Sequence, residues 1–540
     1  MLKLVGNGWK MNRIAKYLNR HVEGAVYSSP LVLTAYATDR SVLKIYPRVV
    51  AMPESAEDVR KLVRFSNQLA IKGISLPVTV RGTGMDETGA AIGSGMIISM
   101  EKMNEILEID VRQRLVRVRA GVRLGELQSA LALHGLTLPL DGHPNLTVGG
   151  MVANHFSGSS SEKYGTIANY VSQVEVVLSN GEIVQTMLLS PRNLKRRKEL
   201  MTFEGEVYRK LDELVEKNEE VLEEIPDPRT NLTGYPFVAK LKRKNGAFDL
   251  LPVFYGSQGS LGIVTELILS CEPARERPQH AIMLLPSVKH ALKLIEEVLE
   301  LKPAELNVYD LALIKEATES GKLLKIFKKL PESGVLLAAT FDDMRGRRRI
   351  KRVKQLTTLL KGKTRIAISN DENYSDFSEL KSILSVYVNS GLKGVRVPLV
   401  DNAYIPTGRL TDYCSLLVVL GKKYKMELPM FGSILMNHYS VRPKVDLETV
   451  LGRQLALAFM RDYTKVVTVC GGALVAGTPE GRLKAALTND MMDVKLASLY
   501  GEVKKIFDPQ GIMNPGIKQE ATLRAVVRQL RTSYNQGIVD

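Results

Sequence analysis

The sequence predicts an α+β fold of two or three domains, on the basis of its length and two patterns along the chain. The 540 residues are 45% hydrophobic and 24% charged, as in globular proteins with sizeable cores. Three glycine-rich loops adjoin apolar, strand-like segments: the first glycine loop at 81–89, the second at 147–165 and the third at 256–266. Residues 280–370 then alternate apolar strands with amphipathic helices, which favours a sheet covered by helices on one side.

The first elements can be placed from local signals. A helix is predicted to begin at Ser55, because Ser55 and Asp58 resemble a capping box and apolar residues follow at helical spacing. Two buried strands are predicted, one at residues 74–80 (ISLPVTV) and one at residues 96–100 (MIISM). The first glycine loop therefore connects a pair of strands.

The elements that follow alternate in type. Apolar and basic residues alternate over residues 114–122 (RLVRVRAGV), as in a strand with one face exposed to solvent. LGELQSALALHGL predicts a helix that ends at Gly135. VSQVEVVLSNGEIVQT predicts a hairpin whose Asn180 and Gly181 are the pair that type I′ turns favour. Residues 190–245 are charged and helical, which indicates an insertion.

Charge and cysteine content restrict the partners and the compartment. Lysine and arginine number 74 against 58 aspartates and glutamates, so the net charge of +16 favours a phosphorylated cofactor, carboxylate substrates, an acidic membrane surface or nucleic acid, or else a generally basic solvated surface. Cys271, Cys414 and Cys470 are far apart, which excludes a disulfide framework and a CxxC metal or iron–sulfur pattern. Without a run of about 18 apolar residues, a soluble cytoplasmic protein is expected, peripheral to the inner face of a membrane at most.

The first glycine loop, RGTGMDETG, does not fit the dinucleotide fingerprint GxGxxG, because no helix begins inside it. Its glycines can still turn successive N–H groups inward as an anion-binding nest, beside the fixed charge of Arg81. A tight turn is the alternative. Three such loops in one chain favour a long, multiply phosphorylated ligand held by main-chain donors.

Five segments occur in the order of the motifs of a known family: YPRVVAMPESAEDVRKLVRFSN, VTVRGTGMDETG, LPLDGHPNLTVGGMVANHFSGSSSEKYG, YGSQGSLGIVTE and VKKIFDPQGIMNPG. Over roughly residues 35–516 the chain resembles the FAD-linked oxidases of the vanillyl-alcohol oxidase and p-cresol methylhydroxylase (PCMH) superfamily. Its likeness is closest to the glycolate oxidase and D-lactate dehydrogenase branch.

The resemblance implies a division into domains and a cofactor. The expected order is an N-terminal extension (1–40), a PCMH-type FAD-binding domain of two subdomains (41–275, with the insertion at 190–245), an α+β, ferredoxin-like cap (276–516) and a tail (517–540). Relatives with covalent flavin commonly attach it to a histidine near the first loop, where this chain has none. Noncovalent FAD is therefore expected.

Individual positions at the cofactor are carried over from the same motifs. They are Arg81, Gly82, Thr83, Gly84 and Gly89 around the pyrophosphate; Gly149, Gly150, Asn154, Ser157 and Gly158 along the flavin and ribityl chain; Ile263 and Val264 against the dinucleotide; and Asn514 near the flavin. Asn514 is alternatively a turn residue before Pro515. Met85 stands where the family usually has threonine, and Asp86 and Glu87 add negative charge, so weaker FAD binding is conceivable.

The substrate side departs from the family. The 2-hydroxyacid branch carries GHxGxGNxH and GEHG segments that supply metal ligands. Here FGSILMNHYSVRP retains His438 and Arg442 without the paired histidines, and CGGALVAGTPEGRLK has Glu480 without an adjacent histidine, so no metal is predicted. His438, Arg442, Glu480 and Arg396 are the catalytic candidates. His438 is alternatively a satisfied structural histidine.

Two basic segments leave alternatives open. RGRRRIKRVK, at 345–354, suits a nucleic-acid or lipid patch, or a helix with Ile350 and Val353 inward and a solvated outer face. The tail carries a short basic amphipathic helix that docks elsewhere or packs back on the body.

The predicted function is FAD-dependent oxidation of a small hydroxy compound, with a 2-hydroxy acid such as lactate or glycolate as the best substrate. Electrons leave to a separate acceptor: oxygen, a quinone or a protein. No nucleic-acid partner is expected, while peripheral membrane contact and a homodimer are compatible with the sequence. The alternative is a catalytically degenerate FAD-binding or structural subunit of the same fold.

Overall fold

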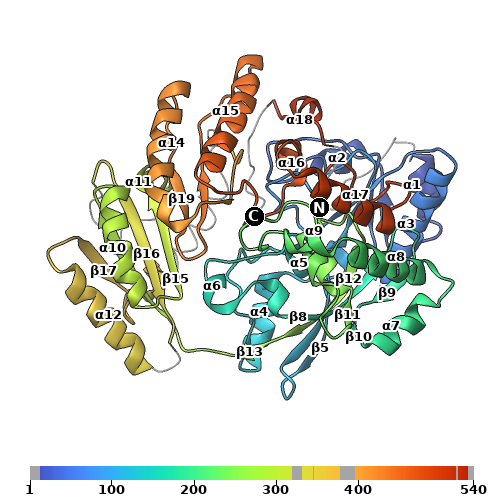
Figure 1. Ribbon diagram of the computed structural model, residues 1–540, viewed down its shortest axis with the longest axis horizontal. Coiled ribbons are helices and arrows are strands. Elements are labelled where there is room, and N and C mark those ends of the chain that lie inside the picture. The colour runs from blue at the N-terminus through green and yellow to red at the C-terminus, as the bar shows by residue number, and fades with distance from the viewer. Residues whose placement is uncertain (1–11, 319–330, 344–345, 378–395, 519–520, 533–540) are drawn as a thin grey trace.

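The computed structural model describes residues 12–318, 331–343, 346–377, 396–518 and 521–532. Two parts lie side by side in Figure 1. The blue-to-green first half of the chain forms one part, and a large sheet with its helices, from yellow-green to orange, forms the other. The mixture of separate sheets and helices confirms the α+β class.

A small sheet near the N-terminus carries the first glycine loop. Its order is β1 (Ala25–Tyr27), β2 (Val49–Met52), β4 (Met96–Ser99), β3 (Val78–Arg81), with the last three parallel. Helices α1 (Arg13–Leu18), α2 (Pro30–Ala35) and α3 (Ala56–Ile71) accompany it. Helix α3 begins as predicted, because the Ser55 hydroxyl accepts a hydrogen bond from the Asp58 N–H. Strand β3 begins only at Val78, one residue after Pro77, which has no N–H to offer a neighbouring strand.

A five-stranded antiparallel sheet completes the first half. Its order is β5 (Ile106–Asp110), β6 (Leu115–Arg119), β12 (Ile263–Ser270), β8 (Val171–Val177), β9 (Ile183–Gln185). Helix α4 (Leu124–Leu133) ends just before Gly135, whose φ is +67°. Two short pairs, β7 (Leu136–Thr137) with β13 (Glu272–Pro273) and β10 (Leu188–Leu189) with β11 (Phe248–Asp249), add to this half.

The β8–β9 hairpin confirms the predicted strands but not the predicted turn. The Leu178 N–H donates to the Glu182 carbonyl, which leaves a three-residue loop between them. Gly181 has φ +90°, whereas Asn180 is not among the residues with positive φ. A type I′ turn needs positive φ at both central residues, so that prediction is wrong. Glycine at the last loop position is typical of three-residue hairpins instead.

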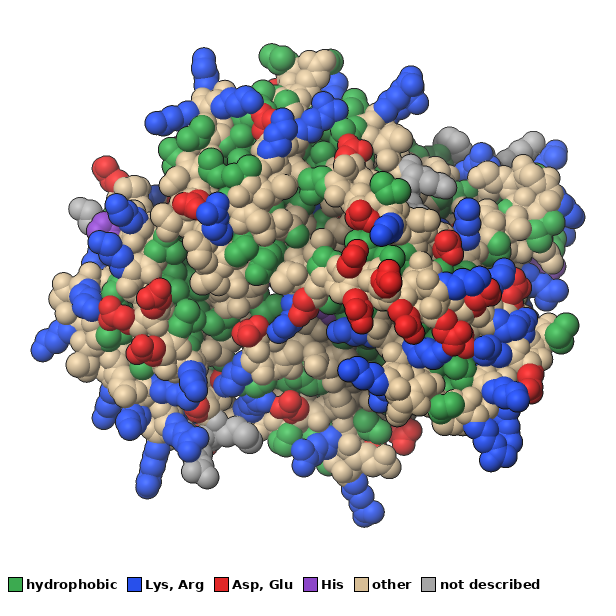
Figure 2. Space-filling view, in the orientation of Figure 1, with side chains coloured by type: hydrophobic (Ala, Val, Ile, Leu, Met, Phe, Trp, Pro, Cys, Tyr) green, Lys and Arg blue, Asp and Glu red, His purple; other side chains and the backbone are tan. Residues whose placement is uncertain are grey.

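The charged stretch at 190–245 packs as helices on the first half: α7 (Pro191–Lys198), α8 (Phe203–Lys217) and α9 (Glu219–Glu223). Helix α8 buries Val207, Leu211 and Leu214 on one face. Figure 2 shows acidic side chains gathered where α9 lies. The charges of this stretch therefore lie outside and its apolar residues inside.

A seven-stranded antiparallel sheet, here called the cap sheet, forms the second part. Its order is β17 (Arg365–Ile368), β14 (Gln279–Leu285), β16 (Val335–Phe341), β15 (Glu305–Asp310), β19 (Met430–Ser433), β20 (His438–Val441), β18 (Ala403–Tyr404). Helices α10 (Val288–Glu300) and α12 (Gly346–Leu360) connect its strands. The path β14-α10-β15-β16-α12-β17 in the order β17-β14-β16-β15 is that of a ferredoxin-like unit, as the resemblance implied.

Helices lie on both faces of the cap sheet, so the predicted one-sided cover is wrong. Met283 and Leu285 belong to the main core with α10 and α12, whereas Ile282 and Leu284 pack with Leu311 of α11 (Leu311–Thr318). Apolar residues at five successive positions of β14, 281–285, make this possible, since successive side chains of a strand point to opposite faces. Helices α14 (Leu410–Tyr424) and α15 (Val450–Val469) continue this part (Figure 1).

The basic segment after 345 forms α12. Val353 is buried as predicted, but Ile350 is 48% exposed and not inward. Of the basic segment, residue 345 lies outside the described residues.

The C-terminal segment returns to the first half. Helices α16 (Gly481–Asn489) and α17 (Val494–Phe507) lie over it in red in Figure 1. The Val78 N–H donates to the Ile512 carbonyl at 2.8 Å, and the Asn514 N–H to the Val78 carbonyl at 2.7 Å. The described part of the tail, with α18 (Leu523–Gln529), packs back, since the Arg531 guanidinium donates to the Leu43 carbonyl at 2.9 Å. In the ranges described above, none of the helices is both long and apolar enough to span a bilayer.

Candidate functional site

A cavity of about 590 Å³, here called the central cavity, lies between the glycine loops and the cap sheet. Its walls come from distant parts of the chain. The first half contributes residues 82–87, Gly149, Gly150, 153–154, 156–159, 257–259 and Val264, and the cap sheet contributes Asn307, Tyr309, 431–433, His438 and Ser440. The three glycine loops that sequence spacing singled out thus meet around one cavity.

The first glycine loop offers a row of main-chain donors. In the structure as described, the N–H groups of residues 82–87 donate no hydrogen bond to the protein, although all six residues line the cavity. Main-chain N–H groups that find no acceptor in the protein are satisfied by water or by a ligand at such a wall. Successive N–H groups in a glycine-rich turn form a concave site for anions.

Arg81 supports this loop from behind. Its guanidinium donates to the Thr38 carbonyl at 2.8 Å and lies 5.0 Å from the centre of the Tyr36 ring. Gly84 has φ +78°, and the Arg81 guanidinium occupies the place where a Cβ would be. Thr83 donates to the Asn145 carbonyl at 2.7 Å, which ties the first loop to the second.

The second loop enters the cavity through helix α5 (Val148–Ala153). The Thr147 hydroxyl accepts from the Gly150 N–H at 3.3 Å and caps this helix. The Asn154 side chain accepts from the Gln258 amide at 3.0 Å, which joins the second loop to the third.

Ten of the predicted cofactor residues line the central cavity: Gly82, Thr83, Gly84, Met85, Gly149, Gly150, Asn154, Ser157, Gly158 and Val264. Arg81, Gly89, Ile263 and Asn514 are not among its lining residues. The Asn514 amide donates to the Ala90 and Gln258 carbonyls, at 2.9 and 2.8 Å, and its oxygen accepts from Arg482 at 2.7 Å. Asn514 thus joins the C-terminal segment to the loops behind the cavity wall.

His438, on β20, is the catalytic candidate that lines the cavity. Its Nε2 lies 2.8 Å from the Arg229 carbonyl, which can only accept, so Nε2 carries the hydrogen. Nδ1 is then an acceptor. A Cβ at residue 477 would lie 3.1 Å from it, and Gly477 leaves that space open. Burial lowers the pKa of His438 to about 4, so the ring is neutral at pH 7.

Arg442, four residues further along, lies buried behind the wall. Its Nη1 is 3.0 Å from Asp401 Oδ2, and its Nη2 is 3.4 Å from Glu87 Oε2. The guanidinium carbon also lies 5.5 Å from the centre of the Phe431 ring. Arg442 therefore joins the first glycine loop to the cap sheet through two carboxylates.

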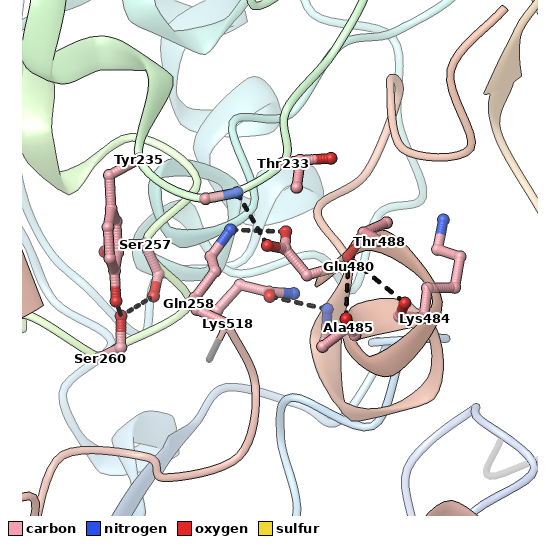
Figure 3. Close-up of polar contacts among 12 residues, drawn as sticks. Thr233, Tyr235, Ser257, Gln258, Ser260, Glu480, Lys484, Ala485, Thr488 and Lys518 are labelled. Atoms are coloured by element: carbon pink, nitrogen blue, oxygen red, sulfur yellow. Dashed lines mark hydrogen bonds and ion pairs between the residues drawn. The ribbon is translucent and has the colours of Figure 1, made fainter. Parts of the chain in front are cut away.

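Glu480 is fully buried (0% exposed) and does not line the cavity. Its carboxylate is 2.7 Å from Lys518 Nζ and accepts from the Gly234 N–H at 2.8 Å. Figure 3 shows it between Gln258 and the residues of α16. The neighbouring Arg482 donates to the Gly89 carbonyl at 2.7 Å. These contacts hold the C-terminal segment against the first half.

Arg396 is also buried and away from the cavity wall. Its guanidinium donates to Glu316 at 2.7 Å and to the Arg442 carbonyl at 2.9 Å. Arg396 thus holds the main chain at Arg442, which directly follows β20. In the described residues, no group of three or more histidine, cysteine, aspartate or glutamate side chains is placed to hold a metal ion.

Several polar cavity residues were not among the predicted site residues: Arg40, Asn307, Tyr309, Asn402 and Thr478. Asn307 and Tyr309 are two apart on β15 and therefore share a face. An asparagine inside the apolar run ELNVYD was a usable signal for that strand. Asn402 and Thr478 lie in loops, where spacing carries no such signal.

Two family models match the chain: an FAD binding domain over residues 47–187 and the C-terminal domain of FAD linked oxidases over residues 275–517. The chain is 25% identical to D-2-hydroxyglutarate dehydrogenase of Haemophilus influenzae over 536 residues, covering 92% of this chain and 50% of that protein. It is 23% identical to D-lactate dehydrogenase of Archaeoglobus fulgidus, covering 89% and 95%. Among solved structures, p-cresol methylhydroxylase with substrate bound matches with a TM-score of 0.65 at 13% identity, over 92% of this chain and 94% of that one. The chain spans about half the length of the D-2-hydroxyglutarate dehydrogenases that it matches.

Proposed function

Because the chain belongs to the PCMH-type FAD-linked oxidases, we propose that it binds FAD in the central cavity and oxidises a small hydroxy compound. A 2-hydroxy acid such as lactate or glycolate is the best substrate. The first half holds the cofactor, and the cap sheet forms the substrate side.

The observation that carries this proposal is the row of six N–H donors in residues 82–87 at the wall of a cavity that continues to His438. The residues fit FAD, because paired phosphates would accept those N–H groups and need no side chain to do so. Noncovalent binding is proposed, since the first loop contains no histidine.

When bound, FAD supplies the hydride acceptor. The chain's own residues hold and orient the substrate. His438 presents Nδ1 as an acceptor at the substrate side and helps to position the substrate, while Nε2–H on the Arg229 carbonyl fixes the ring. Phe431 and Met436 of the cavity wall exclude water from the reacting carbon.

A carboxylate on the substrate needs a cation near the cap side. Arg40 lines the cavity, and Arg442 lies just behind its wall. Arg442 already contacts two carboxylates, which favours a small substrate with a single negative charge at most. Oxygen, a quinone or a second protein then takes the electrons, in the cytoplasm or at the inner face of a membrane.

The engagement of Arg442 by Glu87 and Asp401 also favours a second candidate function, an FAD-binding subunit that has lost catalysis. In that case the protein binds FAD through the same loops and performs no oxidation.

Anaerobic mixing separates the two. The FAD-loaded protein is titrated with D- and L-lactate, glycolate and larger 2-hydroxy acids, and the flavin absorbance is followed. Bleaching by one of them is the expected result. A loaded protein that dithionite bleaches but no hydroxy compound does would support the second candidate.

A further inference from the structure

Glu87 is the last residue of the donor row in the first glycine loop, and its side chain faces the central cavity with 18% of its surface exposed. Its hydrogen bonds are long: the two carboxylate oxygens lie 3.5 and 3.4 Å from Arg442 Nη2. The carboxylate therefore lies at the boundary between the loop and the cap sheet, and it retains room for another donor.

The other acidic side chains of the central cavity wall are placed differently. Asp86 Oδ1 accepts from the Thr88 N–H, the Thr88 hydroxyl and the Ala90 N–H at 2.8 to 2.9 Å, so it is part of the turn. Asp141 is exposed at the mouth of the cavity.

Two histidines also line the described wall. His143 Nδ1 accepts from the Asn145 N–H at 3.1 Å. His438 keeps Nδ1 open, but its pKa of about 4 makes it a weak base at neutral pH. Glu87, next to Arg442, and His438, on β20, are thus the acidic and histidine side chains of the described wall that lie at the cap sheet.

The charges around Glu87 favour it as the base. Burial raises the pKa of Glu87, Arg442 and Arg40 lower it and Asp401 raises it, so that the pKa lies at about 7. Lys484, behind Asp401, also faces this group. A carboxylate with a pKa near the working pH is present in its charged form and still binds a proton well.

We propose that Glu87 is the proton acceptor of this site, a role that rests on the proposed function. The C–H bond of the substrate breaks with both electrons leaving as hydride to FAD, the carbinol oxygen forms the C=O bond, and the hydroxyl proton goes to the Glu87 carboxylate. The substrate is oxidised by two electrons and FAD is reduced by two.

Asp401 compensates the charge of Arg442 during this proton transfer. When Glu87 becomes neutral, Arg442 keeps its 3.0 Å ion pair with Asp401, so no uncompensated cation remains buried. The pair of carboxylates on one arginine thus allows one of them to change charge.

The test compares wild type with Glu87→Gln, Glu87→Asp and a matched control, Glu204→Gln. Glu204 is a partly buried glutamate on α8 whose pKa burial also raises, and it does not line the cavity. Flavin reduction is followed by anaerobic stopped flow from pH 5 to 9 in the loaded proteins. Infrared spectroscopy follows the carboxylic acid C=O band over the same pH range, without substrate.

Glu87→Gln is expected to slow reduction by about 10²- to 10⁴-fold and to remove the rise of the rate through pH 7, whereas Glu87→Asp keeps that rise at a lower rate. Wild type and Glu204→Gln are expected to share an infrared band that titrates near pH 7 and that Glu87→Gln lacks. Wild-type rates and pH dependence in Glu87→Gln would overturn the role of Glu87 alone, as would an infrared titration unchanged by that substitution. A wild-type protein that no hydroxy compound reduces would contradict the proposed function itself.

Discussion

The guanidinium of Arg81 lies against the face of Gly84 on which every other residue carries its Cβ. Gly84 has φ +78°, so the loop is held in a left-handed conformation with an arginine packed beneath it. The contact lies in the loop whose residues 82–87 line the cavity.

Gly84→Ala is expected to weaken FAD binding about tenfold or more, because the new methyl displaces Arg81 and turns the donor row. Gly73→Ala is the matched control: Gly73 has φ +75° and no heavy atom within 4 Å of the added Cβ. The control is expected to cost about 1 kcal/mol of stability and to keep FAD. Flavin-to-protein absorbance ratios measure the effect, and equal FAD content in both variants would contradict it.

The ion pair of Glu480 with Lys518 is expected to be structural. Glu480→Gln leaves Lys518 charged and buried, which lowers the free energy of unfolding by about 3–5 kcal/mol. The double variant Glu480→Gln/Lys518→Met should recover part of this loss, because both charges are gone. Urea midpoints of the three proteins provide the measurement. Additive losses would show that the pair has no coupling.

These two sites illustrate what the sequence could predict. The first glycine loop was identified from the sequence because several glycines directly after a strand indicate a tight turn of the backbone. Glu480 was predicted to be catalytic from its place in a family segment, but its partner Lys518 follows 38 residues later and approaches only when α17 folds back. An ion-pair partner is a tertiary contact, so no local pattern reveals it.

The same distinction holds for the cap sheet. The alternation of strands and helices predicted an α+β layer, since each element has its own period, whereas the family resemblance implied the ferredoxin-like unit. The sequence did not predict which face of β14 packs against α11. Ile282 and Met283 point to opposite faces and are equally apolar, so the two faces of the strand cannot be told apart by pattern. Similarly, Arg396 was predicted to be a catalytic candidate, whereas in the structure its guanidinium pairs with Glu316 of α11 and does not line the cavity.

Stability is expected to depend on pH through His438. The unfolded chain takes up a proton near pH 6.5, whereas the folded protein keeps the ring neutral until about pH 4. Between these values the unfolded state binds more protons, so stability falls as the pH drops through this window, by up to about 3 kcal/mol from this group. His155, buried with a pKa of about 3, acts in the same direction.

Thermal midpoints from pH 4 to 8 measure this effect, with His438→Asn compared against wild type. Glu87 and Asp39, whose pKa values burial raises to about 7 and about 6, contribute the opposite slope in both proteins. The variant is therefore expected to show a smaller loss of stability below pH 6.5. An identical slope in both proteins would exclude His438 as a source.

Asp342, just after β16, is expected to hold the cap sheet on the first half. Tyr164 and Lys163 of α6 (Ser161–Tyr164) both donate to its carboxylate, and Arg275 lies 3.9 Å from the centre of the Tyr164 ring. Asp342→Asn should cost about 1–3 kcal/mol and speed proteolysis between the two parts. Asp343→Asn is the control, because Asp343 pairs with Arg352 of α12 within the same part. Equal cleavage rates in both variants would contradict this role of Asp342.

The proposed function depends on noncovalent FAD held by the loops around residues 82–87, in the cavity that the cap sheet closes. The visible spectrum of the purified protein after incubation with FAD, and then that of the supernatant after acid denaturation, measure this binding. We expect a flavin spectrum at one FAD per chain, all of it released into the supernatant. A protein that remains colourless with excess FAD would show that the cavity does not hold this cofactor.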